Sequence, residues 1–177
     1  MVGMAIFKND KMVGRISNDD ALGYVFAMGN VTDSYIVVED GASMAALHIR
    51  KMICKRKVLL RPDGGIQINL SLEGMIDLGE LRGFSQSKAL ELVSQLQVLA
   101  NQEVQDRILS AFEAAKELNA DIFGFGTSVY RKYPKAWRDM EARWDELFQD
   151  INLSITADLK MRGTGQITQS LMEETQR

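Results

Sequence analysis

The sequence predicts an α+β fold, with a mostly antiparallel or mixed sheet on which one long amphipathic helix and two shorter helices pack. Three features predict it: alternating apolar and polar residues cluster before residue 74, a helical repeat spans residues 87–118, and one more alternating segment follows at 153–161. Strands that cluster before the helices, with one late strand returning to the sheet, favour a layered α+β architecture. The chain has no βαβ series and no GxGxxG motif, so a dinucleotide-binding fold is not expected.

The composition is that of one globular domain. The chain has 177 residues, of which 46% are hydrophobic and 25% are charged, and only two are prolines. Because the composition does not break along the chain, we expect a single α+β domain over residues 1–163 and a polar, frayed tail over 164–177. The net charge of −3 supplies no overall positive field, which argues against nucleic acid as a partner.

The first forty residues predict a hairpin, a helix and a strand. Two short apolar-rich segments within residues 4–16 are joined by a polar turn. Ser17 or Asn18 can cap a helix that ends at Gly29, and a strand is predicted over 34–39. Helical spacing assigns three apolar residues to the buried side of this helix: Leu22, Val25 and Phe26.

The middle of the chain predicts a long hairpin. Apolar residues alternate over 45–50 and again from Val58, but the phase changes between Ile49 and Val58, so we expect a bulge or bend there. An Asp-Gly-Gly sequence within residues 61–65 favours a tight turn. Residues 66–73 alternate cleanly, which predicts one buried and one solvated face.

The rest of the chain predicts three helices and a strand. Residues 87–118 contain neither Gly nor Pro and predict a helix about 48 Å long. Asn119 is a suitable end for it, and Asp121 is a suitable cap for the turn that follows. Pro134 suits the first turn of another helix, and the last strand is predicted over 153–161. Five residues are assigned to the buried stripe of the Pro134 helix: Trp137, Met140, Trp144, Leu147 and Phe148.

No set of residues assembles into a catalytic or metal site. Cys54 is the single cysteine, which excludes an internal disulfide and any multi-cysteine metal site. Its use as a nucleophile with His48 is disfavoured, because six residues of extended strand separate the two by roughly 20 Å. The carboxylates within residues 139–146 fit a solvated helix face. We therefore predict that the chain is not an enzyme and has no catalytic residues, no metal and no cofactor.

The basic residues within 50–61 are the strongest local charge feature. They could contact lipid head groups or phosphates, at about 1 kcal/mol for each charge near a membrane. Alternatively, they form the solvated face and protected edge of a hairpin, which is the interpretation we favour. No aromatic residues interleave with them, and this weakens the case for nucleic-acid binding further.

The start of the chain has no targeting feature. It lacks the charged start, apolar core and cleavage site of a signal peptide, and no apolar segment approaches the roughly 18 residues that cross a bilayer. Cys54 lacks the small and apolar residues that precede a lipidated cysteine. We therefore expect the sequence to be a fragment that begins in mid-protein.

The Gly124-Phe125-Gly126 segment allows two interpretations. It is either a corner between helices that aromatic residues pin in place, or a partner-docking corner that also uses Tyr130, Tyr133 and Trp137, which are residue types favoured at binding hot spots. The residues alone leave both open. In either case we expect Gly126→Val to disrupt the corner, because a β-branched residue is penalised where a turn needs positive φ.

The order of these parts resembles the C-terminal domain of the C subunit of bacterial spore germinant receptors, the Ger(x)C family. The resemblance rests on the Asp-Ile-Phe-Gly-Phe-Gly turn at 121–126, the Tyr-Arg-Lys-Tyr-Pro segment at 130–134, Trp137 and Trp144. It extends to the strand at 153–161, which leads into Arg-Gly, and to the order of the preceding hairpins. It covers essentially the whole chain.

The resemblance implies a non-enzymatic subunit domain of a nutrient receptor that triggers germination by protein contact. It also implies membrane-embedded A-type and B-type subunits as partners. A further implication is attachment to the outer face of the spore inner membrane through a lipid on an N-terminal cysteine, which this fragment lacks. Two alternatives remain: a small-ligand-binding domain or hydrolase on a similar scaffold, and a structural spacer above the membrane.

Overall fold

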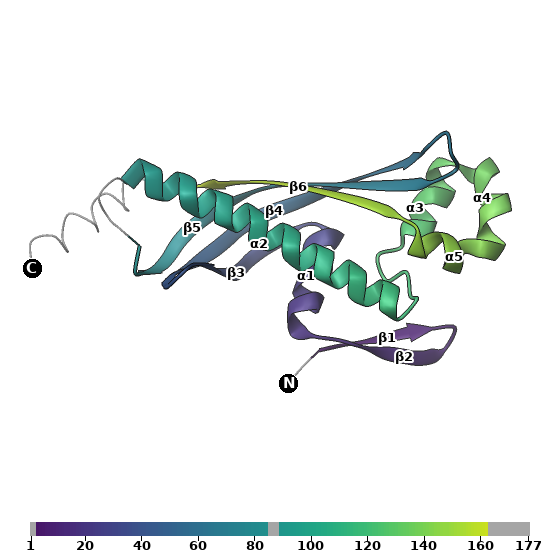
Figure 1. The fold of residues 1–177 in the computed structure, drawn as a ribbon, viewed down its shortest axis with the longest axis horizontal. Coiled ribbons are helices and arrows are strands. Elements are labelled where there is room, and N and C mark those ends of the chain that lie inside the picture. The colour runs from purple at the N-terminus through teal and green to yellow at the C-terminus, as the bar shows by residue number, and fades with distance from the viewer. Residues whose placement is uncertain (1–2, 85–88, 163–177) are drawn as a thin grey trace, which may run out of the picture. The chain divides into compact units, whose positions relative to one another are not determined.

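The structure is a computed structural model that describes residues 3–84 and 89–162, and it confirms the predicted α+β class (Figure 1). The N-terminal elements are β1 (Met4–Lys8), β2 (Lys11–Ile16), α1 (Asn18–Met28), β3 (Val31–Asp40), β4 (Ser43–Leu60) and β5 (Ile66–Arg82). The remaining elements are α2 (Ala89–Glu117), α3 (Phe125–Lys132), α4 (Pro134–Met140), the 3₁₀ turn η1 (Glu141–Arg143), α5 (Trp144–Gln149) and β6 (Asn152–Met161). The strands form a β1-β2 sheet and a second sheet in the order β3-β4-β5-β6.

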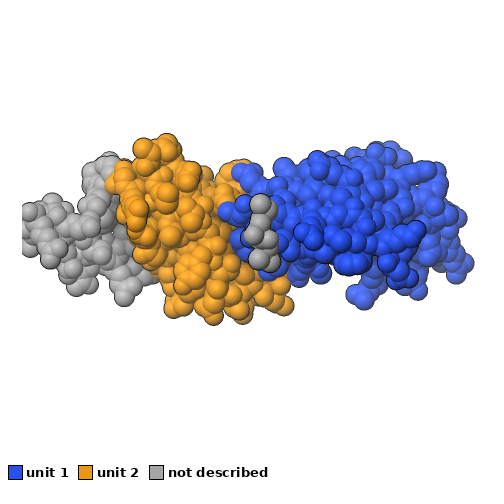
Figure 2. Space-filling view, turned by 90° about the horizontal axis from the view of Figure 1, so that it is seen from below, with its two compact units in different colours: residues 1–28, 54–71, 106–156 blue, residues 29–53, 72–105, 157–177 orange. Residues whose placement is uncertain are grey.

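The chain divides into two compact units, coloured separately in Figure 2. Unit 1 comprises residues 1–28, 54–71 and 106–156, and unit 2 comprises residues 29–53, 72–105 and 157–177. Strands β4, β5 and β6 and helix α2 each contribute residues to both units. The single domain over 1–163 stays a prediction, and the tail over 164–177 lies outside the described residues.

In unit 1, the predicted N-terminal hairpin is confirmed. Strands β1 and β2 pair antiparallel, and their turn places Asn9 and Asp10 at φ of 48° and 64°, which short polar side chains tolerate. The register shifts between Ile6 and Phe7, as it does at a β-bulge. Ile6 is buried in a small cluster at the end of α2, whereas Phe7 is 65% exposed. The buried side of the hairpin therefore packs in this cluster, while Phe7 on its other side faces solvent.

Helix α1 begins with the predicted cap. The Ser17 hydroxyl accepts the backbone N–H of Asp20 at 3.1 Å, and the Asp20 carboxylate accepts the backbone N–H of Ser17 at 3.3 Å, which is a reciprocal capping box. The buried residues of the helix are Gly23, Phe26 and Ala27.

The assignment of Val25 to that buried side is wrong, because its side chain is 46% exposed. Gly23 is the reason. A Cβ at Gly23 would overlap the carbonyl group of Arg107, so α1 approaches α2 most closely along the face that carries this glycine. Val25 lies on another side of α1.

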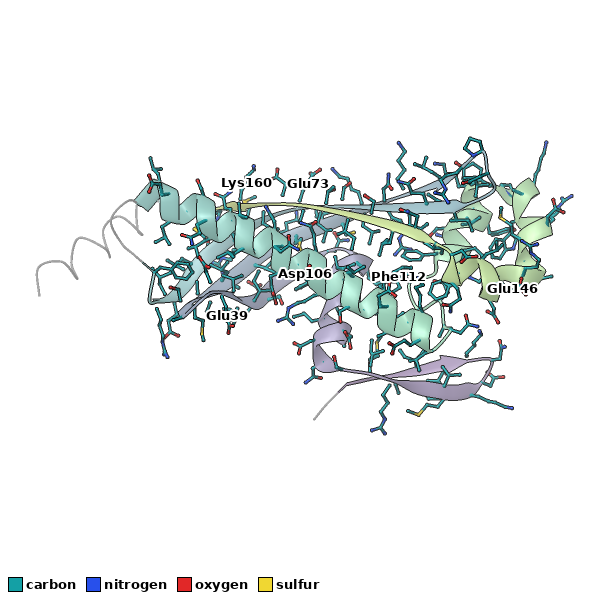
Figure 3. All side chains as sticks on the ribbon, viewed as in Figure 1. Glu39, Glu73, Asp106, Phe112, Glu146 and Lys160 are labelled. Carbon is teal, nitrogen blue, oxygen red and sulfur yellow. The ribbon has the colours of Figure 1, made fainter. Side chains whose placement is uncertain are left out.

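The core of unit 1 is aromatic. The ring of Phe112 on α2, labelled in Figure 3, lies 6.2, 5.9 and 5.8 Å from the ring centroids of Phe123, Phe125 and Phe148. Phe123 and Phe125 stack on each other at 5.2 Å. All four side chains are at most 2% exposed, so the segment after α2 is fixed from inside by ring packing.

The predicted helix from Pro134 is not one helix. It consists of α4, the η1 turn and α5, and only Phe148 of its expected buried stripe is fully buried. The other four residues of the stripe, Trp137, Met140, Trp144 and Leu147, are partly exposed. A change to 3₁₀ geometry at η1 shifts the phase of the side chains, so residues seven apart no longer share one buried face.

In unit 2, β3 pairs antiparallel with β4 in constant register, from Val31 opposite Met52 to Asp40 opposite Ser43. Buried residues of β4 change from odd to even positions between Ile49 and Met52, which is the phase change expected from the sequence. Gln97 and Asn101 of α2 bond to the backbone of Leu159 on β6, so the helix is held to the strand. The helix predicted over 87–118 is confirmed over Ala89–Glu117, and residues 87 and 88 of that prediction lie outside the described residues.

A chain of ion pairs crosses unit 2. Arg50 lies 3.7 Å from Asp33 and 2.9 Å from Asp77, and Arg162 lies 3.2 Å from Asp77. Three of these residues lie on β3, β4 and β5, and Arg162 directly follows β6. The hydrogen bond from Arg162, together with its charge and that of Arg50, lowers the pKa of Asp77 below its ordinary value. The basic residue at position 50 is thus part of the sheet's own ion pairing.

Candidate functional site

The segment that follows α2 is held by one carboxylate. The chain leaves the helix at Asn119, whose φ is 47°, and turns again at Gly124, whose φ is 65°. Asp121 accepts the backbone N–H groups of Phe125 and Gly126 at 2.9 and 2.7 Å. It also lies 3.2 Å from the indole nitrogen of Trp144. The predicted cap is confirmed, and it joins the start of α3 to the start of α5.

Arg56 on β4 holds the same segment from the other side. Its guanidinium donates to the carbonyl of Phe123 at 2.7 Å and to the hydroxyl of Ser128 at 3.2 Å, and it lies 4.9 Å from the centre of the Phe125 ring. Burial lowers the pKa of this arginine. Arg50 and Arg56 are therefore both engaged by other residues of the protein, which supports the structural interpretation of the basic segment.

Gly126 is required for a reason other than the expected one. Its φ is not positive, since the positive-φ glycine of this segment is Gly124. A Cβ at Gly126 would lie 2.9 Å from a ring atom of Trp144 and 3.0 Å from one of Trp137. The two tryptophan rings pack directly on the backbone of α3 at this position. The glycine is needed because the rings leave no room for a side chain.

Three aromatic rings extend outward from this contact. The ring centroids of Trp137 and Trp144 are 5.0 Å apart, and those of Tyr130 and Trp137 are 6.4 Å apart in an edge-to-face arrangement. Tyr130 is 54% exposed, and both tryptophans are partly exposed. The three rings therefore form a row that is partly exposed to solvent and that packs on the backbone of α3 at Gly126.

Two open hollows lie beside this row, both within unit 1. The first hollow has a volume of about 580 Å³ and is lined by Thr127, Tyr130, Pro134, Trp137, Arg138 and Glu141. The second hollow has a volume of about 330 Å³ and is lined by Phe7, Lys8, Ala120, Asp121, Ile122, Gly126, Thr127, Trp137, Trp144 and Asp145. They share Thr127 and Trp137. We call the surface formed by both hollows the aromatic groove.

The predicted docking residues take different places around the groove. Tyr130 and Trp137 line the first hollow, and Gly126 and Trp137 line the second. Phe125 is fully buried and supports the surface from inside. Gly124 and Tyr133 line neither hollow.

Sequence reasoning missed several lining residues. Glu141 belongs to the segment 139–146, whose carboxylates were assigned to a solvated helix face, and Arg138 directly precedes that segment. Phe7 comes from the N-terminal hairpin, more than a hundred residues away in the chain, and no local pattern marks it. A salt bridge of 2.8 Å between Lys8 and Asp145 and a hydrogen bond of 2.6 Å from Lys8 to the carbonyl of Asn119 bring that hairpin to the groove.

The other candidate groups are engaged structurally. Burial raises the pKa of Cys54, which disfavours the reactive thiolate. The ring of His48 stacks on Tyr35 at 4.5 Å, and its Nε2 lies 3.3 Å from an oxygen of Asp33 without forming a hydrogen bond. Within residues 3–84 and 89–162, no group of three or more His, Cys, Asp or Glu residues is placed to hold a metal. No helix in these ranges has the length and apolar character needed to span a membrane.

Comparison with known proteins gives consistent matches. Residues 2–165 match the family model described as spore germination B3/GerAC like, C-terminal. The chain is 25% identical to spore germination protein KC of Bacillus subtilis (strain 168) over 168 residues, which is 92% of this chain and 41% of that protein. It is 22% identical to spore germination protein YndF of the same organism, over 89% of this chain and 40% of that protein.

A solved structure shares the fold. The crystal structure of the GerBC protein matches with a TM-score of 0.78 and 18% identity, over 91% of this chain and 50% of that one. The chain therefore spans half or less of the length of each relative named here.

Proposed function

This chain belongs to the spore germination B3/GerAC-like family, whose C-terminal domain it matches, and from that premise we propose that it is a germinant-receptor domain that acts by protein contact. Its role is to help trigger germination without catalysing a reaction. Its partners are the membrane-embedded A-type and B-type subunits. The full-length protein is held at the outer face of the spore inner membrane through an N-terminal lipid.

The aromatic groove is the observation that carries this proposal. Tyrosine and tryptophan are enriched where binding energy concentrates, because they bury a large area and lose little conformational freedom. Here Tyr130 is exposed to solvent and Trp137 is partly exposed, and both are supported by the packing of Gly126 and Trp144. A preorganised aromatic surface of this kind favours contact with another chain, since little ordering is required on binding.

A second candidate function is small-ligand binding. The first hollow, at about 580 Å³, falls within the range of about 300–1,000 Å³ typical of ligand sites. The hollow is open to solvent, however, so it would bury little of a small ligand's surface. Protein contact is the better fit to an open surface.

The proposal is tested in spores that carry Tyr130→Ala in the full-length subunit. Because Tyr130 is 54% exposed, its truncation should leave the fold intact. We expect nutrient-triggered germination to be strongly reduced at normal subunit level, with nutrient-independent germination unaffected.

The matched control is Tyr35→Ala, which removes a tyrosine that is 63% exposed in unit 2. This variant should respond normally to nutrients. A normal response from Tyr130→Ala spores at normal subunit level would contradict the proposal.

A further inference from the structure

The hairpin of β1 and β2 (Figure 1) exposes apolar side chains that the core of unit 1 does not use. Phe7 is 65% exposed, Met12 is 47% exposed and Val13 is 38% exposed. Large apolar residues that are exposed singly need no explanation, whereas a contiguous exposed group marks a contact surface. These three residues lie on two paired strands, next to the turn that joins them.

The β-bulge of this hairpin places Phe7 and Met12 on one face. Residues that pair across antiparallel strands point to the same side of the sheet. Ile6 pairs with Gly14 on the buried side, where a Cβ at Gly14 would overlap the side chain of Leu118. The register then shifts, so that Phe7 pairs with Met12. Without the shift, alternation would turn Met12 to the side of Gly14, so the bulge redirects Met12 away from the core.

Two basic residues accompany this apolar pair. Lys11 and Arg15 are exposed, and neither forms an ion pair or a hydrogen bond with another residue that the structure describes. Lys8, by contrast, is held by a salt bridge within unit 1. Residues 4–16 contain three basic residues and one acidic residue, so their net charge is +2, whereas the whole chain carries −3. The hairpin therefore combines local positive charge with exposed apolar side chains.

A bilayer with anionic head groups complements both features. Apolar side chains enter the boundary between head groups and acyl chains, while long basic side chains keep their charges at the lipid phosphates. A protein partner is a poorer fit, because a stable protein interface buries about 800 Å² on each side and this hairpin offers three large apolar side chains. A second copy of the hairpin is a poorer fit as well, since it would bring like charges together.

We propose that the hairpin is a lipid-contact surface, in which Phe7 and Met12 enter an anionic bilayer interface while Lys11 and Arg15 contact its phosphates. Phe7 also lines the second hollow, but Met12 lines neither, so this surface extends beyond the aromatic groove. Each cation near an anionic membrane strengthens binding about fivefold. The inference goes beyond the proposed function, because the hairpin can contact lipid whether or not the groove contacts a partner chain.

Sedimentation of the whole 177-residue chain with lipid vesicles tests the inference. One vesicle preparation contains phosphatidylcholine alone, and the other contains phosphatidylcholine and anionic phosphatidylglycerol in equal amounts. We expect binding to the anionic vesicles to be stronger by about tenfold or more, because two unpaired cations act together. Raising the salt concentration should remove most of this difference, since it screens the exposed charges.

Two variants locate the contact. Lys11→Glu reverses one charge of the hairpin and should weaken binding to the anionic vesicles about tenfold or more. Met12→Ser removes apolar surface that would enter the bilayer and should weaken binding about fivefold. The control Lys57→Glu makes the same charge change within residues 50–61, where no large apolar side chain is exposed. It should weaken binding at most about twofold, and circular dichroism confirms that each variant is folded.

Four results would overturn the inference. The first is the absence of binding to anionic vesicles, and the second is equal binding to both preparations. The third is unchanged binding of Met12→Ser, which would indicate charge attraction alone. The fourth is an equal loss in Lys57→Glu and Lys11→Glu, which would place the lipid contact on β4 instead. If no vesicle binds while Tyr130→Ala still abolishes the nutrient response of spores, this inference fails and the proposed function stands.

Discussion

Asp121 and Gly126 show how single residues shape the groove. Asp121 satisfies two backbone donors at the start of α3 and approaches the indole of Trp144, so one carboxylate aligns α3 with α5. Gly126 then admits the rings of Trp137 and Trp144 against the backbone of α3. Gly124 has a different role, since its φ of 65° allows the chain to turn and no atom lies within 4 Å of its missing Cβ.

Alanine substitutions separate these two glycines. Gly126→Ala should cost about 1–3 kcal/mol, because a methyl group would overpack against both tryptophan rings. Gly124→Ala should cost about 1–2 kcal/mol through left-handed backbone strain alone. Urea unfolding measures both losses, and tryptophan fluorescence distinguishes them, since Gly126→Ala alone should change the folded-state spectrum. Identical folded-state spectra would contradict the packing role of Gly126.

At the scale of elements, the sequence pattern predicted what local spacing controls. The hairpin of β1 and β2, the capped start of α1 and the length of α2 were all predicted, because turn chemistry, capping and periodicity act within a few residues. The break between α4 and α5 was not predicted, since Pro134 and the apolar spacing fit one helix equally well. The exposure of Val25 was missed because it depends on which helix face approaches α2.

Arg56 ties β4 to the start of α3, and its shape is as important as its charge. Arg56→Lys keeps the charge but replaces a planar fork with a single ammonium, which cannot hold Phe123 and Ser128 while stacking on Phe125. We expect a loss of about 1–3 kcal/mol in unfolding free energy. Hydrogen exchange of α3 amides should speed up more than that of α1 amides. Unchanged exchange in α3 would contradict the role of Arg56 in holding this element.

The ion pairs of unit 2 predict the direction of a pH effect. The pKa of Asp77 is lowered in the folded protein. Its contribution to the free energy of unfolding is therefore fully present above the ordinary aspartate pKa of about 4, and it is lost as pH falls through the lowered pKa. In urea titrations, Asp77→Asn should therefore lower the free energy of unfolding more at pH 7 than at pH 2. The control Asp139→Asn, at an exposed position, should show no such difference. An equal loss for Asp77→Asn at both pH values would contradict the linkage.

At the scale of the whole molecule, the candidate site was only partly predictable. Tyr130, Trp137 and Gly126 were selected from one local segment, and the structure places all three at the groove. Phe7 and Lys8 join them only because the N-terminal hairpin packs at the end of α2. Such long-range proximity has no signature in a single sequence. The link to spore germination comes from the family match, because the geometry alone does not indicate it.

Recovery of the proposed partners, the membrane-embedded A-type and B-type subunits, with the full-length protein tests the central claim of contact through the aromatic groove most directly. Matched membrane preparations would carry the unchanged protein, Tyr130→Ala or Tyr35→Ala, and the co-purified subunits would be quantified. We predict that Tyr130→Ala lowers their recovery by about tenfold or more, whereas Tyr35→Ala leaves it unchanged. Equal recovery with all three proteins would contradict the account.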